Sequence, residues 1–344
     1  MTYKILSYTF DELQDLMKEL GLKHYRAQQL FNWIYLKRVT DFFEMTNISL
    51  EERDQFGKIF SFPKMSIVQR QQSRDGTVKL LWKLQDGEFI ESVIVRHPNH
   101  TTFCISSQVG CPIGCKFCQT GLSGYVRNLE IEEIVGQMLY MEIEMGKMVD
   151  NIVFMGMGEP FLNTDNVLKS IRIYNDERGR NLGLRHFTIS TVGIPQGITR
   201  FTNEGPEVKL SVSLHASSND KRNKIVPINK KHGIEDIFES LYYYQTITSK
   251  RVTFEYVLIN HFNDYIEDAQ ELYELLKGMS SYVNVIPLNP VSSDLKRPSE
   301  KRTTEFMNRL NLLGVKAELR IEKGADIKAA CGQLKTQYNA GGKE

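Results

Sequence analysis

The sequence lacks any long apolar run, since no stretch approaches the ~18 consecutive apolar residues that a membrane-spanning helix needs. It also lacks an apolar leader. Acidic residues occupy the first twenty positions, where a secretory signal would carry its hydrophobic stretch; they are Asp11, Glu12, Asp15 and Glu19. We therefore expect a cytoplasmic protein with no membrane partner.

The sequence also has no excess of positive or negative charge. The 43 Lys and Arg residues are balanced by 42 Asp and Glu residues, which leaves a net charge of +1. The total charge therefore argues neither for nor against a polyanionic partner, and any basic surface has to be local.

Two local basic groups stand out. The first lies between Lys18 and Arg38, where five basic residues face one acid. Aromatic residues alternate with these charges, which is typical of a nucleic-acid surface, although such aromatics are more often part of a core; they are Tyr25, Phe31, Trp33 and Tyr35. The second group is equally compatible with a solvated helix start; it comprises Lys296, Arg297, Lys301 and Arg302.

Cysteine is scarce, with 5 residues, an odd number. Three of them, Cys111, Cys115 and Cys118, fall within eight positions. This layout is poor for a disulfide framework and suits a metal site. Cys104 and Cys331 are left over.

What is present is an ordinary globular composition of 41% hydrophobic and 25% charged residues over 344 positions. At roughly 150 residues per domain, this length suggests about two domains. Residues 1–60 show helical spacing, as in Leu13, Leu16, Met17 and Leu20, and we expect a small helical domain there. Residues 61–96 read as a linker with a β-hairpin, because two β-prone runs, 78–84 and 89–95, flank Asp86-Gly87.

Residues 97–335 alternate between strand-like and helix-like segments, which predicts a parallel sheet covered by helices. About six consecutive β/α units favour a full or partial barrel, with function at the carboxyl ends of the strands. The expected strands are 103–107, 151–155, 187–191, 208–214, 252–258, 282–288 and 315–321, and the expected helices are 130–145, 165–174, 234–248, 264–277 and 299–313. Residues 336–344 form a polar tail.

The three clustered cysteines have the spacing C-x3-C-x2-C in Cys111-Pro-Ile-Gly-Cys115-Lys-Phe-Cys118. Three thiolates are one short of the four that close a structural zinc site or an iron-sulfur cube. A 4Fe-4S cluster held this way keeps one iron open for an outside ligand. The alternative is a zinc site completed by His97 or His100.

This motif, after the first strand of a β/α barrel, resembles that of the radical S-adenosylmethionine enzymes. In that superfamily the open iron chelates S-adenosylmethionine, and one electron splits it to a 5'-deoxyadenosyl radical. The second strand runs into Gly156-Met-Gly-Glu-Pro160, which is similar to the superfamily's turn that binds the methionine amino group. Glycines let the backbone approach a ligand, and Glu159 can accept a hydrogen bond from an ammonium.

Further segments resemble the RlmN/Cfr family of RNA adenosine methyltransferases: Cys104-Ile-Ser-Ser-Gln-Val-Gly-Cys111, Ser213-Leu-His-Ala216, Val226-Pro-Ile-Asn-Lys230 and Asp326-Ile-Lys-Ala-Ala-Cys-Gly-Gln-Leu334. The resemblance implies a partial (β/α)6-type radical-SAM barrel in an α/β fold, one 4Fe-4S cluster held by Cys111, Cys115 and Cys118, and two S-adenosylmethionine molecules per turnover. It also implies S-adenosylmethionine contacts at Gly158, Glu159, Ser190, Ser213, Leu214, His215 and Asn289.

The implied reaction is methylation at carbon 2 of adenosine, in 23S rRNA and in tRNA. Cys331 would carry the methyl group as S-methylcysteine, Glu91 would be the proton acceptor, and Cys104 would resolve a protein–RNA adduct through a transient disulfide with Cys331. The resemblance also implies a monomer and a flavodoxin-like electron donor. Without it, a core role for His215 and a turn role for Asn289 are equally compatible with the sequence.

Three alternatives stay open. The sister enzymes methylate carbon 8 of the same adenosine, and Pro160 after Glu159 favours carbon 2 over that reaction. A second possibility is a non-catalytic RNA-binding protein that senses redox state through its cluster. A third is a radical enzyme that acts on a small molecule.

Overall fold

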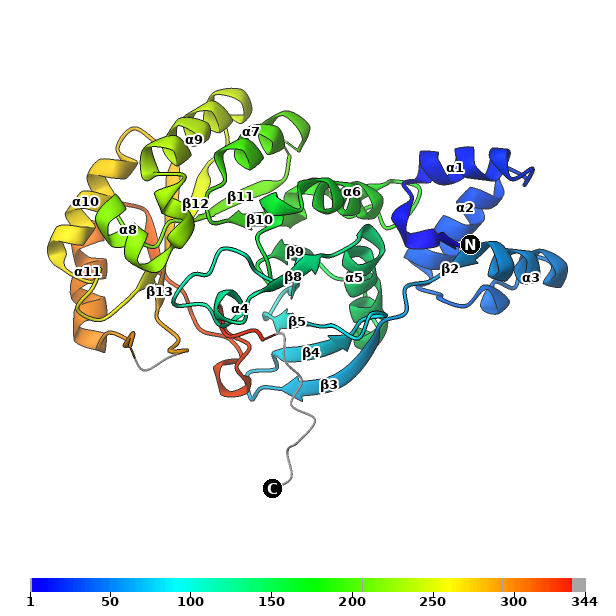
Figure 1. Ribbon diagram of the computed structural model, residues 1–344, viewed down its shortest axis with the longest axis horizontal. Helices are drawn as coiled ribbons and strands as arrows, with labels where there is room; N and C mark the ends of the chain where they lie inside the picture. Colours follow the sequence, from blue (N-terminus) through cyan, green and yellow to red (C-terminus); the bar gives the residue numbers. More distant parts are fainter. Residues whose placement is uncertain (1, 206, 292–293, 336–344) are drawn as a thin grey trace, which may run out of the picture.

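The chain forms an open β/α barrel with a helical unit at its amino-terminal end (Figure 1). The structure is a computed structural model, and it describes residues 2–205, 207–291 and 294–335. One sheet of ten strands runs through the molecule. Its strands are β3 (Ser66–Gln72), β4 (Val78–Lys83), β5 (Phe89–Arg96), β6 (Thr101–Cys104), β9 (Asn151–Phe154), β10 (Phe187–Thr191), β11 (Lys209–Ser213), β12 (Val252–Leu258), β13 (Ser281–Pro287) and β14 (Ala317–Leu319). Their order is β14-β13-β12-β11-β10-β9-β6-β5-β4-β3.

The strands from β6 to β14 are parallel, as expected for consecutive β/α units. They form the partial barrel that the sequence predicts, and every expected strand overlaps an observed one. Helices cover the outside of this barrel (Figure 1): α5 (Ile131–Met145), α6 (Thr164–Asn175), α7 (Pro195–Glu204), α8 (Asn219–Ile225), α9 (Ile234–Thr248), α10 (Ile266–Leu276) and α11 (Glu300–Leu312).

Each expected helix is present, and α9 has the expected bounds. Its buried side chains, among them Ile234, Ile237, Leu241 and Tyr244, follow the spacing of one helix face. Five elements were not predicted from the sequence: α7, α8, β7 (Gln108–Gly110), α4 (Gln119–Leu122) and β8 (Tyr125–Asn128). The last four are too short to show a clear periodicity, whereas α7 buries one face through Gly197, Ile198, Phe201 and Thr202 and was recognisable.

The expected hairpin extends the large sheet. Its strands β4 and β5 flank a turn with Gly87 at φ 90°, and β5 pairs antiparallel with β6, placing Val93 opposite Cys104. Most of β5 is buried, because both faces of this strand are covered. Strand β3, which the sequence analysis did not identify, forms the edge beside β4.

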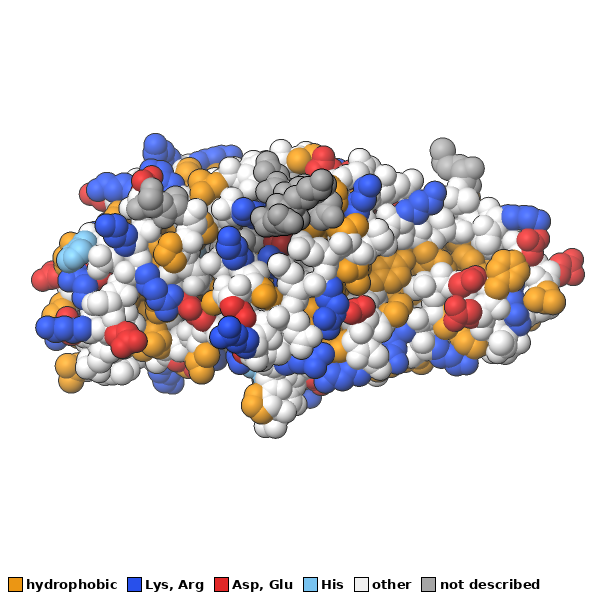
Figure 2. Space-filling view, turned by 90° about the horizontal axis from the view of Figure 1, so that it is seen from below, with side chains coloured by type: hydrophobic (Ala, Val, Ile, Leu, Met, Phe, Trp, Pro, Cys, Tyr) orange, Lys and Arg blue, Asp and Glu red, His pale blue; other side chains and the backbone are white. Residues whose placement is uncertain are grey.

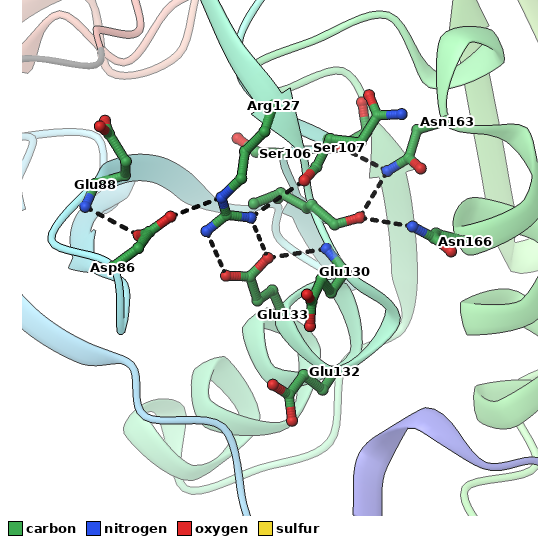
Figure 3. A network of polar contacts seen from close by, with 12 residues as sticks. Asp86, Glu88, Ser106, Ser107, Arg127, Glu130, Glu132, Glu133, Asn163 and Asn166 are labelled. Atoms are coloured by element: carbon green, nitrogen blue, oxygen red, sulfur yellow. Dashed lines mark hydrogen bonds and ion pairs between the residues drawn. The ribbon is translucent and has the colours of Figure 1, made fainter. Parts of the chain in front are cut away.

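A polar network fastens the hairpin turn to the start of α5 (Figure 3). Arg127 on β8 bonds to Asp86 of the β4–β5 turn at 2.7 Å and holds both carboxylate oxygens of Glu133 at 2.7 and 2.8 Å. The amides of Asn163 and Asn166 both donate to the carbonyl of Leu129, at 2.8 and 2.9 Å. The network thus ties the hairpin, β8 and α6 together beside the first parallel strand.

The amino-terminal unit contains α1 (Phe10–Glu19), α2 (Arg26–Phe31), a π-helical turn (Asn32–Leu36) and α3 (Leu50–Ile59), with short 3-10 turns at Ile5–Ser7 and Phe42–Glu44. The two-residue strands β1 (Tyr3–Lys4) and β2 (Phe60–Ser61) pair at its base and are too short to be seen in the sequence. The unit packs on the barrel through Tyr35 against Tyr174, with ring centroids 5.9 Å apart, and through Arg178, which lies 3.8 Å from the ring centre of Phe10.

Two expectations concern the chain as a whole. Among the described residues, no helix has the length and apolar character that crossing a membrane requires. The expected polar tail, residues 336–344, lies outside the described residues.

Candidate functional site

The cysteine motif lies in a loop whose base is closed by a two-stranded sheet. Strands β7 and β8 pair antiparallel on either side of it, and the amide of Cys111 donates to the carbonyl of Gly124 at 2.9 Å. Gly110 makes this closure possible, because a Cβ there would lie 2.1 Å from the Gly124 oxygen. The loop is therefore held rigidly beside the barrel.

All five cysteines of the chain line one cavity, which also reaches the carboxyl ends of β9, β10, β11, β12 and β13. Burial raises the pKa of the Cys111 thiol to about 12 and raises those of Cys115 and Cys118. These thiols have to lose their protons when they bind a metal.

The three motif cysteines fit a four-iron cluster better than a single ion. In a cube each thiolate binds a different iron, so the three sulfurs do not have to meet at one point. Cys111, Cys115 and Cys118 all line the cavity. Within the described part of the chain, no group of three or more His, Cys, Asp or Glu side chains is gathered as for one metal ion. His97 and His100, the histidines of the zinc alternative, stack on each other at 4.2 Å and are not among the cavity-lining residues.

The glycine-rich turn after β9 places Glu159 at the cavity. Its carboxylate accepts hydrogen bonds from the hydroxyl of Thr191 at 2.7 Å and from the amides of Val192 and Phe161 at 2.7 and 3.0 Å. Burial raises the pKa of Glu159 to about 7, against these hydrogen bonds, which favour the charged form. A glycine is needed at position 158 even without a ligand, because the backbone there has φ 103° and a Cβ would lie 2.6 Å from the Cβ of Gln108.

Most of the other residues expected to bind S-adenosylmethionine gather at the same cavity. Ser190 and Ser213 have their hydroxyl oxygens 3.5 Å apart, and Asn289 is buried in the cavity wall. His215 accepts a hydrogen bond from the Val257 amide at its Nδ1, 3.1 Å away, and burial lowers its pKa to about 3, so the ring is neutral. Leu214 differs, since it is fully buried and not among the cavity-lining residues.

Cys104, at the end of β6, and Cys331 lie in the same cavity wall beside a cation. Burial raises the pKa of Cys104 to about 12, and the nearby Cys331 raises it further, while Arg320 opposes the shift. Arg320 is held by Glu255 of β12 at 3.2 Å. Sequence reasoning missed this pair, although an acid inside the apolar run 252–258 is a usable signal, because buried carboxylates are rare.

Glu91, the expected proton acceptor, lies outside the group of residues that line the cavity. Its carboxylate is 3.1 Å from Nζ of Lys79 and accepts a 2.7 Å hydrogen bond from the Lys335 amide. Glu91 is buried on β5 but is not among the residues that line the cavity. Its side chain is therefore engaged by the segment that follows Cys331.

Arg222 on α8 is the other functional candidate that the sequence did not reveal. Its fully buried guanidinium donates to the carbonyls of Leu214, at 2.9 Å, and Val192, and to the side chain of Asn229 at 2.5 Å. The carbonyl of Ile225, at the end of α8, accepts from the amide of Lys116 in the cysteine loop at 3.0 Å. Arg222 thus joins the ends of β10 and β11 to the helix that supports the cysteine motif.

Two family models match the chain. The model described as the radical SAM superfamily matches residues 105–276, and the ribosomal RNA large subunit methyltransferase N-terminal domain matches residues 3–61. A relative from Thermotoga neapolitana, named probable dual-specificity RNA methyltransferase RlmN, is 50% identical over 332 residues, covering 96% of this chain and 97% of the relative. This chain belongs to the RlmN family of radical S-adenosylmethionine methyltransferases.

Other RlmN relatives agree with this assignment. A protein of the same name from Fervidobacterium nodosum is 48% identical over 343 residues, covering 98% of this chain and 99% of the relative. The solved structure of a radical SAM methyltransferase from Sphaerobacter thermophilus has a TM-score of 0.94 at 39% identity, and covers 97% of this chain and 100% of that one. The RlmN family is one of enzymes, which excludes the non-catalytic sensor, and the superfamily implies a 4Fe-4S cluster and S-adenosylmethionine.

Replacement of Arg222 tests whether the buried cation supports the cysteine loop. Arg222→Met leaves several buried carbonyls without donors, and we expect a loss of about 3 kcal/mol or more in the free energy of unfolding, together with a lower iron content. Chemical denaturation and iron analysis measure both. Arg172→Met removes an exposed arginine paired with Glu204 at 3.2 Å and should change neither.

Replacement of the motif cysteines tests the metal. The anaerobically reconstituted protein should hold four irons, and Cys111→Ala, Cys115→Ala or Cys118→Ala should each lose them, because a cube needs all three thiolates here. Metal analysis and the visible absorption spectrum provide the measurement. Stoichiometric zinc without iron in the wild-type protein would contradict the cluster.

Proposed function

We propose that this enzyme methylates carbon 2 of adenosine in RNA, at adenosine 2503 of 23S rRNA and at adenosine 37 of tRNA. The printed name of its relatives, dual-specificity RNA methyltransferase, supports the two kinds of substrate. The observation that supports the chemistry is the common cavity, which Cys104 and Cys331 line together with the three motif cysteines. Pro160 supports carbon 2 over carbon 8.

Carbon 2 of adenine lies between two ring nitrogens and is electron-poor, so it cannot attack a methyl sulfonium directly. An indirect route solves this problem. Cys331 as thiolate takes a methyl group from a first S-adenosylmethionine, and S-adenosylhomocysteine leaves. A 4Fe-4S cluster held by Cys111, Cys115 and Cys118 would supply, when bound, the electron for reductive cleavage of a second S-adenosylmethionine. The S-methyl group of Cys331 would lose a hydrogen atom to the product of that cleavage, and its methylene carbon would then bond to carbon 2 of the ring.

Release of the RNA needs two further groups. Glu91 would accept the ring hydrogen as a proton, and the unpaired electron left by methylene addition would return to the cluster. Cys104 as thiolate would attack the sulfur of Cys331, so that a disulfide forms as the bond between that sulfur and the methylene carbon breaks, and that carbon takes up a proton to become the methyl group. A dithiol reductant would have to reduce the disulfide before the next turnover. Because burial holds Cys104 as a thiol in this state, the attack needs a cation that favours the thiolate. Arg320, which acts electrostatically on both Cys104 and Cys331, is suited to that role.

Seven residues would hold S-adenosylmethionine: Gly158, Glu159, Ser190, Ser213, Leu214, His215 and Asn289. For Leu214 the contact would be through the backbone, since its side chain is in the core. Glu159 would accept from the methionine ammonium, and the neutral His215 keeps Nε2 as a donor because its Nδ1 is already an acceptor.

We assign RNA binding in part to residues 1–60, as an accessory domain joined by residues 61–96 to the catalytic core of residues 97–335. Three of the four aromatics expected there, Phe31, Trp33 and Tyr35, are buried core residues, which leaves Tyr25 exposed. Lys23 and Arg26 lie 6.0 and 4.9 Å from the ring centre of Tyr25. Figure 2 shows Lys and Arg side chains spread along one face with acids among them, and no single basic patch.

The second basic group is less suited to RNA. Arg302 binds Asp264 through two hydrogen bonds of 2.5 and 2.7 Å, and Arg297 pairs with Glu322. These charges are largely compensated within the protein. We further propose a monomer that works in the cytoplasm with a flavodoxin-like electron donor and consumes two S-adenosylmethionine molecules per turnover.

Replacement of Cys104 tests the release step. Cys104→Ala should stop the reaction after the methylene carbon has joined the adenine, leaving RNA attached to Cys331 through a bond that survives denaturation. Mass spectrometry after nuclease digestion should find a modified nucleotide on the Cys331 peptide. The Cys104→Ala, Cys331→Ala double variant is the control and should form no adduct. Methylation by Cys104→Ala at the wild-type rate, with no trapped species, would rule out this role.

Replacement of Tyr25 tests the accessory domain. Tyr25→Ala should weaken binding of a labelled RNA hairpin about five- to tenfold, because an exposed ring beside cations can stack on a base. Binding should also weaken with salt. Fluorescence anisotropy gives the affinity. Tyr242→Ala on α9 is the matched control, since Tyr242 is 47% exposed against 45% for Tyr25. Equal affinity in both variants would show that Tyr25 does not touch RNA.

A further inference from the structure

The residues after β14, numbers 322–335, carry Cys331 and are called the Cys331 segment below. They contain one short 3-10 turn, Ala325–Ile327, and otherwise no regular structure. The segment starts at β14, one edge of the ten-stranded sheet, and crosses to β3 and β4 at the opposite edge (Figure 1). A segment without its own ladder of hydrogen bonds depends on contacts with its surroundings for a fixed position.

After Cys331, the segment is held by the cysteine loop and the hairpin. The carbonyl of Gly332 accepts from the amide of Gln119 at 2.6 Å, and that of Leu334 accepts from the hydroxyl of Thr120 at 2.8 Å. The amide of Lys335 donates to Glu91 at 2.7 Å. These bonds fix only the residues that follow Cys331.

Before Cys331, the segment meets the β3–β4 turn, residues 73–77, in a reciprocal arrangement. The amide of Gly324 donates to Oδ2 of Asp75 at 3.0 Å, and the amide of Arg74 donates to Oδ2 of Asp326 at 3.2 Å. Each partner thus gives a carboxylate to a backbone N–H of the other. We call this pair of bonds the Asp75–Asp326 clasp.

Local geometry fits the clasp closely. Gly324 has φ 67°, and a Cβ there would lie 2.9 Å from Cγ2 of Thr77, so a glycine is needed for the segment to approach the turn. The other carboxylate oxygen of Asp75 accepts from the Thr77 amide at 2.8 Å, which aims Oδ2 at the segment. Partial burial disfavours the charge of Asp75, yet the hydrogen bonds from Thr77, Gly324 and Ser73 outweigh it and hold its pKa at about 2.

The β4–β5 turn offers a direct comparison. Like the β3–β4 turn, it contains an Asp-Gly pair. The glycines are in the same conformation, with Gly76 of the β3–β4 turn at φ 85° and Gly87 of the β4–β5 turn at φ 90°. Oδ1 of Asp86 accepts from the Glu88 amide at 3.1 Å, as Asp75 does within its own turn. Its Oδ2 instead bonds to Arg127 at 2.7 Å, away from the Cys331 segment. The docking function is therefore specific to Asp75 among these two turns.

We propose that the Asp75–Asp326 clasp docks the Cys331 segment on the β3–β4 turn and so positions Cys331 at the wall of the cavity. Asp75 and Asp326 are positioning residues, since both bond to backbone amides and act through the placement of Cys331. Lys79 adds to the dock, with its Nζ 3.4 Å from the carbonyl of Lys328 and 3.1 Å from Glu91. The consequence for methylation rests on the proposed function of Cys331, while the docking itself does not.

Asp75→Asn tests the dock with little change in shape. An amide can still accept from Thr77, but its NH2 group then faces the Gly324 amide and cannot accept from it. In the anaerobically prepared holoenzyme, hydrogen–deuterium exchange of peptides within 322–335 should become about three- to tenfold faster, because a charge-assisted bond is lost. Asp326→Ala should act in the same direction. The melting temperature reports whether each variant is folded.

Asp86→Asn is the matched control. It should accelerate exchange around its own turn and leave 322–335 unchanged. Unchanged exchange of 322–335 in both Asp75→Asn and Asp326→Ala would overturn the proposal; if either variant fails to fold, the remaining one decides.

RNA methylation, measured on the same samples, separates the two proposals. We expect the rate to fall in Asp75→Asn and to be unaffected in Asp86→Asn. Faster exchange with an unchanged methylation rate would leave the dock standing and show that methylation does not depend on it. A lower rate with unchanged exchange would argue against the dock alone.

Discussion

The parallel sheet of this protein stops at β14, which pairs only with β13 among the described strands, and the barrel therefore stays open on one side. A segment without β-structure covers this side, namely the Cys331 segment, which follows β14 and contacts the β3–β4 hairpin. The same open side thus accounts for the placement of the last cysteine, which lies beyond the last strand and reaches the cavity in this segment.

Each buried charge around the cavity has hydrogen-bonding partners or an opposite charge beside it. Glu159 is surrounded by three donors, Arg222 by carbonyl oxygens and an amide, and Arg320 by Glu255. Burial of a lone charge would be costly, whereas a charge with its hydrogen bonds satisfied is tolerated and fixes geometry. The thiols, by contrast, have few partners, and burial keeps Cys104 and the motif cysteines protonated until a metal or a reaction step removes the proton.

Sequence patterns predicted the barrel because each β/α unit repeats a strand and a helix long enough to show its period. They predicted the metal site because its three thiols lie within eight residues. They failed where contacts join distant segments. Nothing local distinguishes Arg222 from a solvated arginine, or Asp75 from Asp86, since both aspartates occur in Asp-Gly turns. For the aromatics of residues 25–35 the more common core role was the correct interpretation for Phe31, Trp33 and Tyr35, but composition could not single out Tyr25 as the exposed one.

Glu91 shows how these long-range contacts join the proposed steps of the reaction. One of its oxygens faces Lys79 and the other accepts from Lys335, four residues after Cys331. A carboxylate that takes a proton from the adenine ring has to point an oxygen at that ring, and in this state both are engaged by the protein. Displacement of residues 332–335 would free Oε2 while the Asp75–Asp326 clasp still held the start of the segment. The two anchors of the Cys331 segment have different partners, the β3–β4 turn before Cys331 and Gln119, Thr120 and Glu91 after it, so the role proposed for Glu91 requires only the second anchor to open.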